Sequence, residues 1–279
     1  MMEYYFDLLG LDMVLKTPHH IQISERLLPF MQDCPDKADC TIELSYGSLP
    51  EPEKPGYRHS FCFYEVSGLR FFHSEIPGAP AYAMTEFLAN GDIRLVAKPE
   101  YAFYFTGTSG ILNRIGFENL LLHHHSVLLH ASLIKYAGQG IAFTGTSGVG
   151  KSTQADLWHR CLGADVLNGD RAALRLTDQG WIAYGSPFAG TSNIYRNDHA
   201  PLRAVVVLEQ GKENHLERLN GALAMKYIWP EISARRWDRN FTEPASALCA
   251  QLINQIPVYL LRCLPNEDAV TLLKEGLSL

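Results

Sequence analysis

The stretch of sequence that decides the fold reads GIAFTGTSGVGKSTQADLWHRCLG and spans residues 140–163. The apolar run Ile141–Thr144 predicts a buried strand, and Lys151–Leu162 predicts a helix that ends at Gly163. Between them, Gly145–Ser152 matches the pattern G-x-x-x-x-G-K-[ST] at every fixed position, in the strand-to-helix context that the pattern requires. The sequence therefore predicts a phosphate-binding loop (P-loop, or Walker A motif). A glycine-rich turn without a ligand is the alternative.

The residue types in this loop suit nucleotide binding. Gly145, Gly148 and Gly150 let the backbone turn its N–H groups toward phosphate oxygens, and the start of the helix adds positive potential. Lys151 supplies a charge at the β- and γ-phosphates, and the hydroxyl of Ser152 can bind Mg²⁺. We therefore expect ATP and Mg²⁺ as ligands. The expected nucleotide-binding residues are Gly145, Thr146, Ser147, Gly148, Val149, Gly150, Lys151, Ser152 and Thr153.

The chain from residue 126 onward alternates predicted strands and helices, which indicates an α/β core. A continuous apolar strand is expected at Val127–Tyr136, and Asn266 is the expected N-cap of a last helix. Further strands are expected near 165–167, 172–176, 181–184, 204–209 and 258–263, and helices near 244–255 and 266–276.

Two acidic residues are candidates to lie near the phosphates. Asp170 follows the strand expected directly after the helix of the loop, so a βαβ unit can return it beside the phosphates. Glu209 ends the apolar run 204–208, but such runs are common in buried parallel strands, and we interpret this one so. Asp170 is therefore the acid expected beside the phosphates and the metal.

Residues 1–108 carry the pattern of a smaller, β-rich domain, with aromatic or β-branched pieces separated by Gly and Pro. Helical spacing begins at Ile111, so the expected boundary lies near residues 107–110, and residues 109–279 form the expected ATP-binding domain. The first domain has no titratable cluster at a catalytic spacing. We therefore expect it to recognise the acceptor and not to carry the chemistry.

Composition and charge exclude several classes of protein. Hydrophobic residues make up 47% and charged residues 19%, so the chain can bury a core. With 24 Lys+Arg against 30 Asp+Glu, its net charge of -6 argues against nucleic-acid and anionic-membrane partners. The six cysteines form no CxxC pair, and residues 1–16 lack the basic start of a signal peptide. A cytoplasmic protein is expected, and its oligomeric state is left open.

Four features resemble, in order and spacing, the catalytic domain of the HPr kinase/phosphorylase family, and more closely its stand-alone HPr-kinase-like proteins. They are His130-Ala131, the turn Gly138–Gly140, the loop 145–152 and the strand ending in Asp170-Arg171. The resemblance covers roughly residues 126–279. It implies an α/β P-loop kinase core of the HPr kinase/phosphoenolpyruvate carboxykinase type, here preceded by the smaller β-rich domain. It also implies ATP with Mg²⁺, and phosphorylation of a Ser hydroxyl.

The same resemblance implies roles for individual residues. Asp170 would accept the proton of the hydroxyl and, with Ser152, bind the metal, while His130 would lie beside Asp170 and the γ-phosphate. From pattern alone, a lone histidine on a strand is more often a satisfied structural residue. The family has two adjacent acids where Gly169-Asp170 stand, so glycine replaces one acid in this sequence.

A cation is needed near the transferred phosphoryl group, because charge develops on its equatorial oxygens. The Gly- and Ser-rich segment 185–196 ends in Arg196, which is the first candidate, and Arg171 is the second. A surface turn with a solvated arginine is the alternative. The expected catalytic residues are His130, Lys151, Asp170 and Arg196.

These features together predict an ATP-dependent kinase that transfers the γ-phosphoryl group to a hydroxyl, most plausibly Ser of a peptide or small protein. A kinase of a free small-molecule hydroxyl, such as an amino acid or a sugar, is the alternative enzyme. A nucleotide-binding sensor without catalysis is the alternative outside enzymes, and the replacement of an acid by Gly169 favours it. Binding of ATP without turnover over candidate hydroxyls would identify the sensor.

Overall fold

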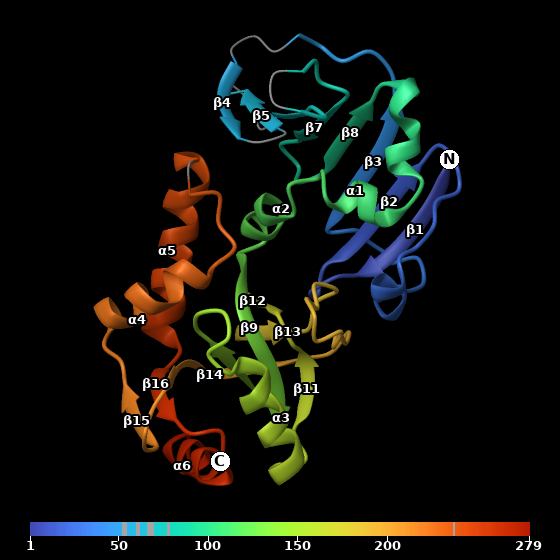
Figure 1. The fold of residues 1–279 in the computed structure, drawn as a ribbon. Coiled ribbons are helices and arrows are strands. Elements are labelled where there is room, and N and C mark those ends of the chain that lie inside the picture. Colours follow the sequence, from blue (N-terminus) through green and yellow to red (C-terminus); the bar gives the residue numbers. More distant parts are fainter. Residues whose placement is uncertain (52–54, 60–61, 66–69, 77–78, 237) are drawn as a thin grey trace. The chain divides into compact units, whose positions relative to one another are not determined.

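The chain folds into two compact units, Met1–Leu120 and Leu121–Leu279, in a computed structural model (Figure 1). The structure describes residues 1–51, 55–59, 62–65, 70–76, 79–236 and 238–279. Each unit contains an eight-stranded sheet, so the molecule is of the mixed α/β class. None of the helices in this described part is both long and apolar enough to cross a membrane.

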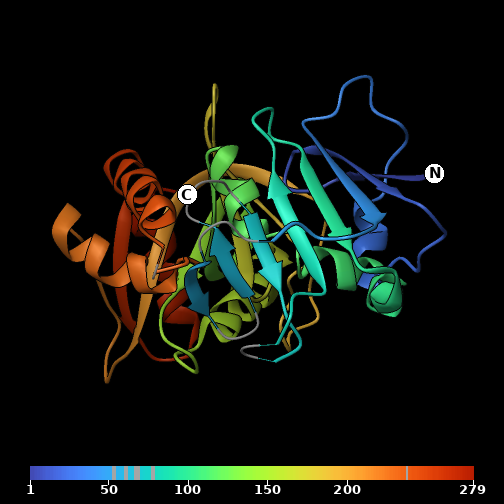
Figure 2. The same ribbon diagram turned by 90° about the horizontal axis from the view of Figure 1, so that it is seen from above.

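The first unit is built around one sheet whose strands lie side by side in the order β1-β2-β3-β8-β7-β6-β5-β4 (Figure 2). The pairs β2–β3 and β3–β8 are parallel, whereas β1 pairs antiparallel with β2 and β7 pairs antiparallel with β8. The strands are β1 (Met2–Asp7), β2 (Asp12–Thr17), β3 (Cys40–Tyr46), β4 (Pro55–His59), β5 (Cys62–Glu65), β6 (Arg70–His73), β7 (Ala83–Phe87) and β8 (Ile93–Ala97).

One face of this sheet is buried because apolar side chains alternate along its strands. Cys40, Ile42 and Leu44 of β3 are buried, and the residues between them are more exposed. The 3-10 helices η1 (Glu25–Phe30) and η2 (Pro99–Phe105) bury Leu27 and Phe30, and Phe105. Helix α1 (Thr108–Leu112) belongs to the same unit, since Thr108 and Leu112 border an apolar cavity together with Leu27 and Ile42.

The first unit continues past the boundary expected at residue 108. The backbone N–H of Ser24 donates to Thr108 Oγ1 at 3.0 Å, and Arg114 Nε donates to Tyr82 Oη at 2.7 Å. The guanidinium of Arg114 also lies 5.1 Å from the ring centroid of Tyr104, within cation–π range. These contacts tie residues 108–114 to the β-rich unit, and the division falls between Leu120 and Leu121.

The second unit contains the remaining elements, after helix α2 (Phe117–His123), which crosses the division. Its sheet has the order β10-β9-β12-β13-β14-β16-β15, with β11 also paired to β9 and β10 also paired to β14. The elements are β9 (Ser126–Tyr136), β10 (Gln139–Thr144), α3 (Lys151–Leu162), β11 (Asp165–Asn168), β12 (Arg171–Thr177), β13 (Gly180–Tyr184), β14 (His199–Gln210), β15 (His215–Arg218), α4 (Gly221–Ile228), η3 (Trp229–Glu231), α5 (Arg239–Gln255), β16 (Val258–Cys263) and α6 (Glu267–Gly276).

Both faces of the second sheet are covered by helices. Val205 and Val207 of β14 belong to an apolar cluster with residues of α4 and α5. Val206 and Leu208 belong to a second cluster with Trp158 of α3 and residues of α6. Side chains of successive strand residues point to opposite faces, so the run 204–208 is apolar throughout because both faces are buried. The interpretation of this run as a buried strand is confirmed.

The expected elements of this unit are found close to their predicted positions. Helix α3 spans Lys151–Leu162 as predicted, and Gly163 ends it with φ of 69°. The side chain of Asn266 caps α6 by accepting from the backbone N–H of Ala269 at 3.2 Å. One arrangement differs from a simple βαβ unit: β9 lies between β10 and β11 and is antiparallel to both, so β11 runs parallel to β10 one strand away.

Candidate functional site

The loop between β10 and α3 contains three glycines in left-handed backbone conformations. Gly145, Gly148 and Gly150 all have positive φ, of 136°, 79° and 115°. Gly145 also lies against the neighbouring strand, since a Cβ there would meet Leu208 O at 3.1 Å and Val149 Cγ1 at 3.2 Å. At this position a glycine is required both by conformation and by the close approach of β14.

Lys151 lies inside the loop with its side chain buried. Its ammonium donates to Gly145 O at 2.8 Å and Thr146 O at 3.2 Å. Burial lowers the pKa of the Lys151 amine, while the charges of Glu231 and Asp170 act in the opposite direction. The backbone carbonyls thus hold the ammonium where an entering phosphate can replace them as its partner. Ser152, the next residue, is exposed.

A cavity of about 300 Å³ lies over the loop and the start of α3. We call it the transfer cavity. It brings together three of the four expected catalytic residues, namely Lys151, His130 and Asp170. Its lining consists of His130, Ser147, Gly148, Gly150, Lys151, Ser152, Thr153, Gly169, Asp170, Thr191 and Ser192.

His130 is held between two carboxylates. Its Nδ1 lies 2.9 Å from Glu231 Oε2, and its Nε2 lies 3.6 Å from Asp170 Oδ1. A carboxylate can only accept at Nδ1, so Glu231 fixes a proton on Nδ1 and leaves Nε2 facing Asp170. The strand register supports this placement, because Thr144 Oγ1 at the start of the loop donates to His130 O at 2.9 Å.

Asp170 is positioned by a buried asparagine that the sequence analysis did not single out. Asn168 is fully buried, and its Oδ1 accepts from the backbone N–H groups of Asp170 at 2.8 Å and Arg171 at 2.6 Å. Its Nδ2 donates to Ser186 O at 2.8 Å. The turn between β11 and β12 is therefore fixed from inside. An asparagine two residues before an acid is typical of an Asx turn, and this pattern could have identified Asn168 from the sequence.

Glu231 was also missed, and its contact with His130 is non-local. It belongs to η3, which is tied to β9 by the bridge between Ile232 and Leu129. Arg236 Nη2 donates to Pro230 O at 2.6 Å and so clamps the turn from its other side. Nothing in the local sequence around Glu231 indicates that it reaches His130, which is 101 residues away.

Gly169 occupies the place where the resemblance implied another acid. A Cβ at this position would collide with the Cβ and Oγ of Ser192. Ser192 is itself fixed, because its Oγ donates to Ala189 O at 2.6 Å and accepts from the backbone N–H of Ile194 at 3.3 Å. The segment 189–194 therefore fills the space that a second acidic side chain would need.

The two candidate arginines lie in different places. Arg196 pairs with Asp165 at 3.0 Å, is exposed, and borders an adjoining cavity of about 190 Å³, which shares Ser152, Gly169 and Ser192 with the transfer cavity. The structure does not bring it into the lining of the transfer cavity. Arg171 lies nearer, with its Nε 3.7 Å from Asp170 Oδ2.

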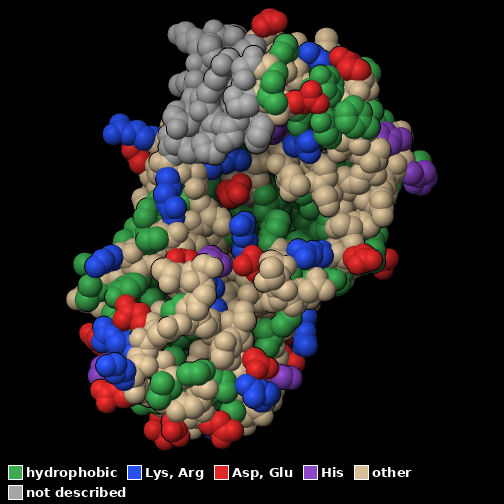
Figure 3. Space-filling model, in the orientation of Figure 1, with side chains coloured by type: hydrophobic (Ala, Val, Ile, Leu, Met, Phe, Trp, Pro, Cys, Tyr) green, Lys and Arg blue, Asp and Glu red, His purple; other side chains and the backbone are tan. Residues whose placement is uncertain are grey.

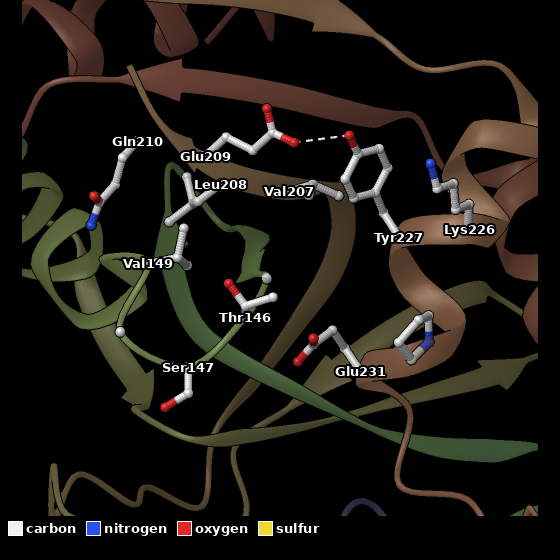
Figure 4. A pocket seen from close by; sticks show the side chains of 13 residues that line it. Thr146, Ser147, Val149, Val207, Leu208, Glu209, Gln210, Lys226, Tyr227 and Glu231 are labelled. Carbon is white, nitrogen blue, oxygen red and sulfur yellow. Dashed lines mark hydrogen bonds between the residues drawn. The ribbon is translucent and has the colours of Figure 1, made fainter. Parts of the chain in front are cut away.

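A larger cavity of about 560 Å³ adjoins the other side of the loop (Figure 4). We call it the large cavity. Figure 4 shows Tyr227 and Glu209 joined on one side of it, with Thr146 and Ser147 of the loop opposite. Tyr227 Oη donates to Glu209 Oε1 at 2.8 Å, and Arg262 Nε donates to Glu209 Oε2 at 3.0 Å. Both carboxylate oxygens of Glu209 thus accept hydrogen bonds from neighbouring side chains.

The residues of the transfer cavity fit a magnesium ion held jointly with phosphates. The exposed hydroxyl of Ser152 and the carboxylate of Asp170 both line it, and Mg²⁺ prefers few carboxylates together with phosphate oxygens. Among the described residues, no group of three or more His, Cys, Asp or Glu side chains could hold a metal ion alone. A magnesium ion held by these two side chains would need further ligands, such as phosphate oxygens.

Acidic and basic side chains are interspersed over the second unit on the face shown in Figure 3. The second unit also contains ion pairs between such side chains. Arg160 pairs with Asp156 at 2.9 Å, and Lys135 pairs with Asp198 at 2.9 Å. These neighbouring opposite charges limit the potential that either sign can build up locally.

Comparisons with known proteins find weak likeness among solved structures. No protein-family model matches the chain, and no curated protein matches it. Among solved structures, the HPr(Ser) kinase/phosphatase from Coxiella burnetii matches with a TM-score of 0.30 and 14% identity. The match covers 54% of this chain and 87% of that chain. We therefore infer the function from the site itself.

Proposed function

We propose that the protein is an ATP-dependent phosphotransferase that moves the γ-phosphoryl group to a hydroxyl, with Ser of a peptide or small protein as acceptor. The observation that supports it is the transfer cavity. A phosphate-type loop with a buried lysine forms one wall, and a His130–Asp170 pair held by Glu231 forms another. Phosphoryl transfer needs these parts: a cradle for the phosphates and a group that receives the proton of the nucleophile.

The proposed reaction proceeds at Asp170. The loop N–H groups and Lys151 hold the β- and γ-phosphates, and the acceptor hydroxyl lies against the Asp170 carboxylate. The hydroxyl oxygen bonds to the γ-phosphorus, the bond from that phosphorus to the β-γ bridging oxygen breaks, and ADP leaves. Asp170 receives the hydroxyl proton, and His130 Nε2 lies at its other side. Bound Mg²⁺, held by Ser152, Asp170 and phosphate oxygens, would offset the charge of the transferred group.

We assign acceptor recognition to the β-rich first unit, as an extension of this proposal. The unit has its own sheet and its own buried core, and the proposed chemistry lies in the second unit. A cytoplasmic setting, where ATP and Mg²⁺ are present, agrees with this function. If the first unit recognises the acceptor and the second carries the chemistry, the second unit alone would bind the nucleotide.

Mass spectrometry of acceptors after incubation with Mg·ATP tests the function. The acceptors are Ser-containing peptides encoded beside the gene, together with a panel of free hydroxyl compounds that includes amino acids and sugars. We expect a mass increase of one phosphoryl group on a peptide, and its loss in Lys151→Ala, which removes the ammonium aimed at the phosphates. The matched control is Lys135→Ala, a half-buried lysine outside the cavity. Equal transfer by Lys151→Ala would contradict the proposal, and transfer to a free compound alone would make the protein a small-molecule kinase.

A nucleotide-binding sensor is the second candidate, and Gly169 is the observation that favours it. The site contains one acid at the turn between β11 and β12, and Ser192 fills the place of another. A sensor would bind ATP as tightly as an enzyme but would convert none of it in the presence of the whole acceptor panel. The same mass-spectrometric experiment, combined with a binding measurement, separates the two functions.

A further inference from the structure

The large cavity is continuous with the loop that would hold the phosphates. Ser147 and Gly148 line both the large cavity and the transfer cavity. The wall of the large cavity includes the whole first half of the loop, from Gly145 to Val149. A ligand whose phosphates lie in the loop can therefore extend into this cavity without crossing the protein.

The large cavity differs in volume from the cavity beside Arg196, which also adjoins the site. Pockets that hold nucleoside-sized ligands usually measure about 300–1,000 Å³. The large cavity, at about 560 Å³, falls within that range. The cavity beside Arg196 and His159 measures about 190 Å³ and falls below it. Of the two, only the large cavity has room for a base and its ribose.

The lining also suits a base. Val149 and Pro230 provide an apolar surface, whereas Val207 and Leu208, which also line the cavity, are almost wholly buried. Tyr227 adds an aromatic ring whose hydroxyl is tethered to Glu209, and this hydrogen bond raises the pKa of the phenol, so it stays protonated. The ring is therefore held in one orientation before any ligand binds. Such a preformed aromatic face is the usual platform for a nucleobase, because every base offers a π-face to it.

We propose that the large cavity holds the nucleoside half of the nucleotide, with the base stacked on the ring of Tyr227. This inference rests on the proposed function, because it takes a nucleoside triphosphate as the ligand of the loop. Lys226 is exposed at the mouth of the cavity and meets the polar edge of the nucleoside. The acceptor hydroxyl would then approach from the opposite side, past Ser192.

Titration calorimetry of the full chain with two probes tests the assignment. The probes are Mg·ATP and Mg·tripolyphosphate, which share the phosphates and differ by the nucleoside. We expect ATP to bind more tightly to the unmodified chain. Tyr227→Ala should weaken the binding of ATP by about 5- to 150-fold, the usual effect of removing a stacked aromatic, and leave the binding of tripolyphosphate unchanged. Tyr227→Phe, the matched control, keeps the ring and should stay within about threefold of the unmodified affinity for ATP.

The outcomes separate this inference from the proposed function. If neither probe binds, the proposed function fails. If both bind equally well, or if Tyr227→Ala weakens both to the same extent, the assignment of the large cavity is overturned while the loop remains a phosphate site. Photolabelling of the unmodified chain with 8-azido-ATP adds a test that needs no variant. We expect the label on residues 207–231, and label confined to residues around His159 would overturn the assignment.

Discussion

Gly169 offers a sharp test of how the transfer cavity is packed, because a methyl group added there would collide with one side chain, that of Ser192. Its backbone is not left-handed, so alanine can adopt it without conformational strain. The new Cβ would collide with the side chain of Ser192. The cost of Gly169→Ala is therefore steric, and it depends on whether Ser192 can move.

The magnitude follows from the bonds that Ser192 makes. Overpacking by one methyl costs about 1–3 kcal/mol, and moving Ser192 would also break its bonds to Ala189 and Ile194. We expect Gly169→Ala to lower the free energy of unfolding by about 2 kcal/mol. Ser192→Gly alone should cost about 1 kcal/mol, from the lost hydrogen bonds. The double variant has no such collision. Its loss of unfolding free energy should therefore be smaller than the sum of the two single losses by about 1–2 kcal/mol.

Urea unfolding of the four proteins in this cycle measures the coupling. Ser192→Ala is the matched control, because it removes the hydroxyl and keeps the Cβ, so the collision with that Cβ remains. Additivity within about 0.5 kcal/mol between Gly169→Ala and Ser192→Gly would refute the steric reasoning. It would mean that the segment 189–194 moves away freely and that the second acid is absent for some other reason.

Three further predictions concern the chemistry of the site. Asp170→Asn should leave ATP affinity nearly unchanged in calorimetry while turnover falls by about 10² to 10⁴, the usual contribution of a general base; a parallel loss of ATP binding would make Asp170 mainly a metal ligand. Glu231→Gln keeps an acceptor for His130 Nδ1 and should retain more turnover than Glu231→Ala, with a shifted pH–rate profile in both; equal profiles in all three proteins would assign Glu231 a structural role only. Burial lowers the pKa of Lys151 in the free protein, and a bound anion raises it, so ATP affinity should fall as pH rises through the lowered pKa, with proton uptake on binding in that range. Calorimetry in buffers of different ionisation enthalpy measures that uptake, and Lys151→Arg should abolish it, because arginine stays protonated.

Local chemistry explains why some features could be predicted from the sequence. The glycines, Lys151 and the helix that ends at Gly163 are dictated by backbone conformation and by end signals within a few residues. The position of Asp170 beside the loop could be predicted from the helix that follows the loop and the strand that follows that helix. Even there, the order of strands was not foreseen, because β9 inserts between β10 and β11 through pairing that no short pattern encodes.

Features that depend on distant contacts could not be predicted. Glu231 contacts His130 because a turn after α4 is tied to β9, and Tyr227 reaches Glu209 across the end of β14. The extension of the first unit to Leu120 depends on Arg114, which binds Tyr82 far back along the chain. In each case the contact joins residues that are far apart in the sequence, and composition and local spacing do not record such a contact.

The pairing of β9 with β10 has a consequence for how the site can fail. Leu129, Ala131 and Leu133 belong to one apolar cluster, whereas His130 points to the opposite face with Ile134. A slip of β9 by a single residue would exchange these faces and turn the imidazole into the apolar cluster, away from both carboxylates. Sorting of apolar from polar side chains along one strand thus also sets the alignment of His130 with the two carboxylates, so the site should be present or absent as a whole. Core substitutions in β9 should therefore remove active molecules without producing a population of partly active ones.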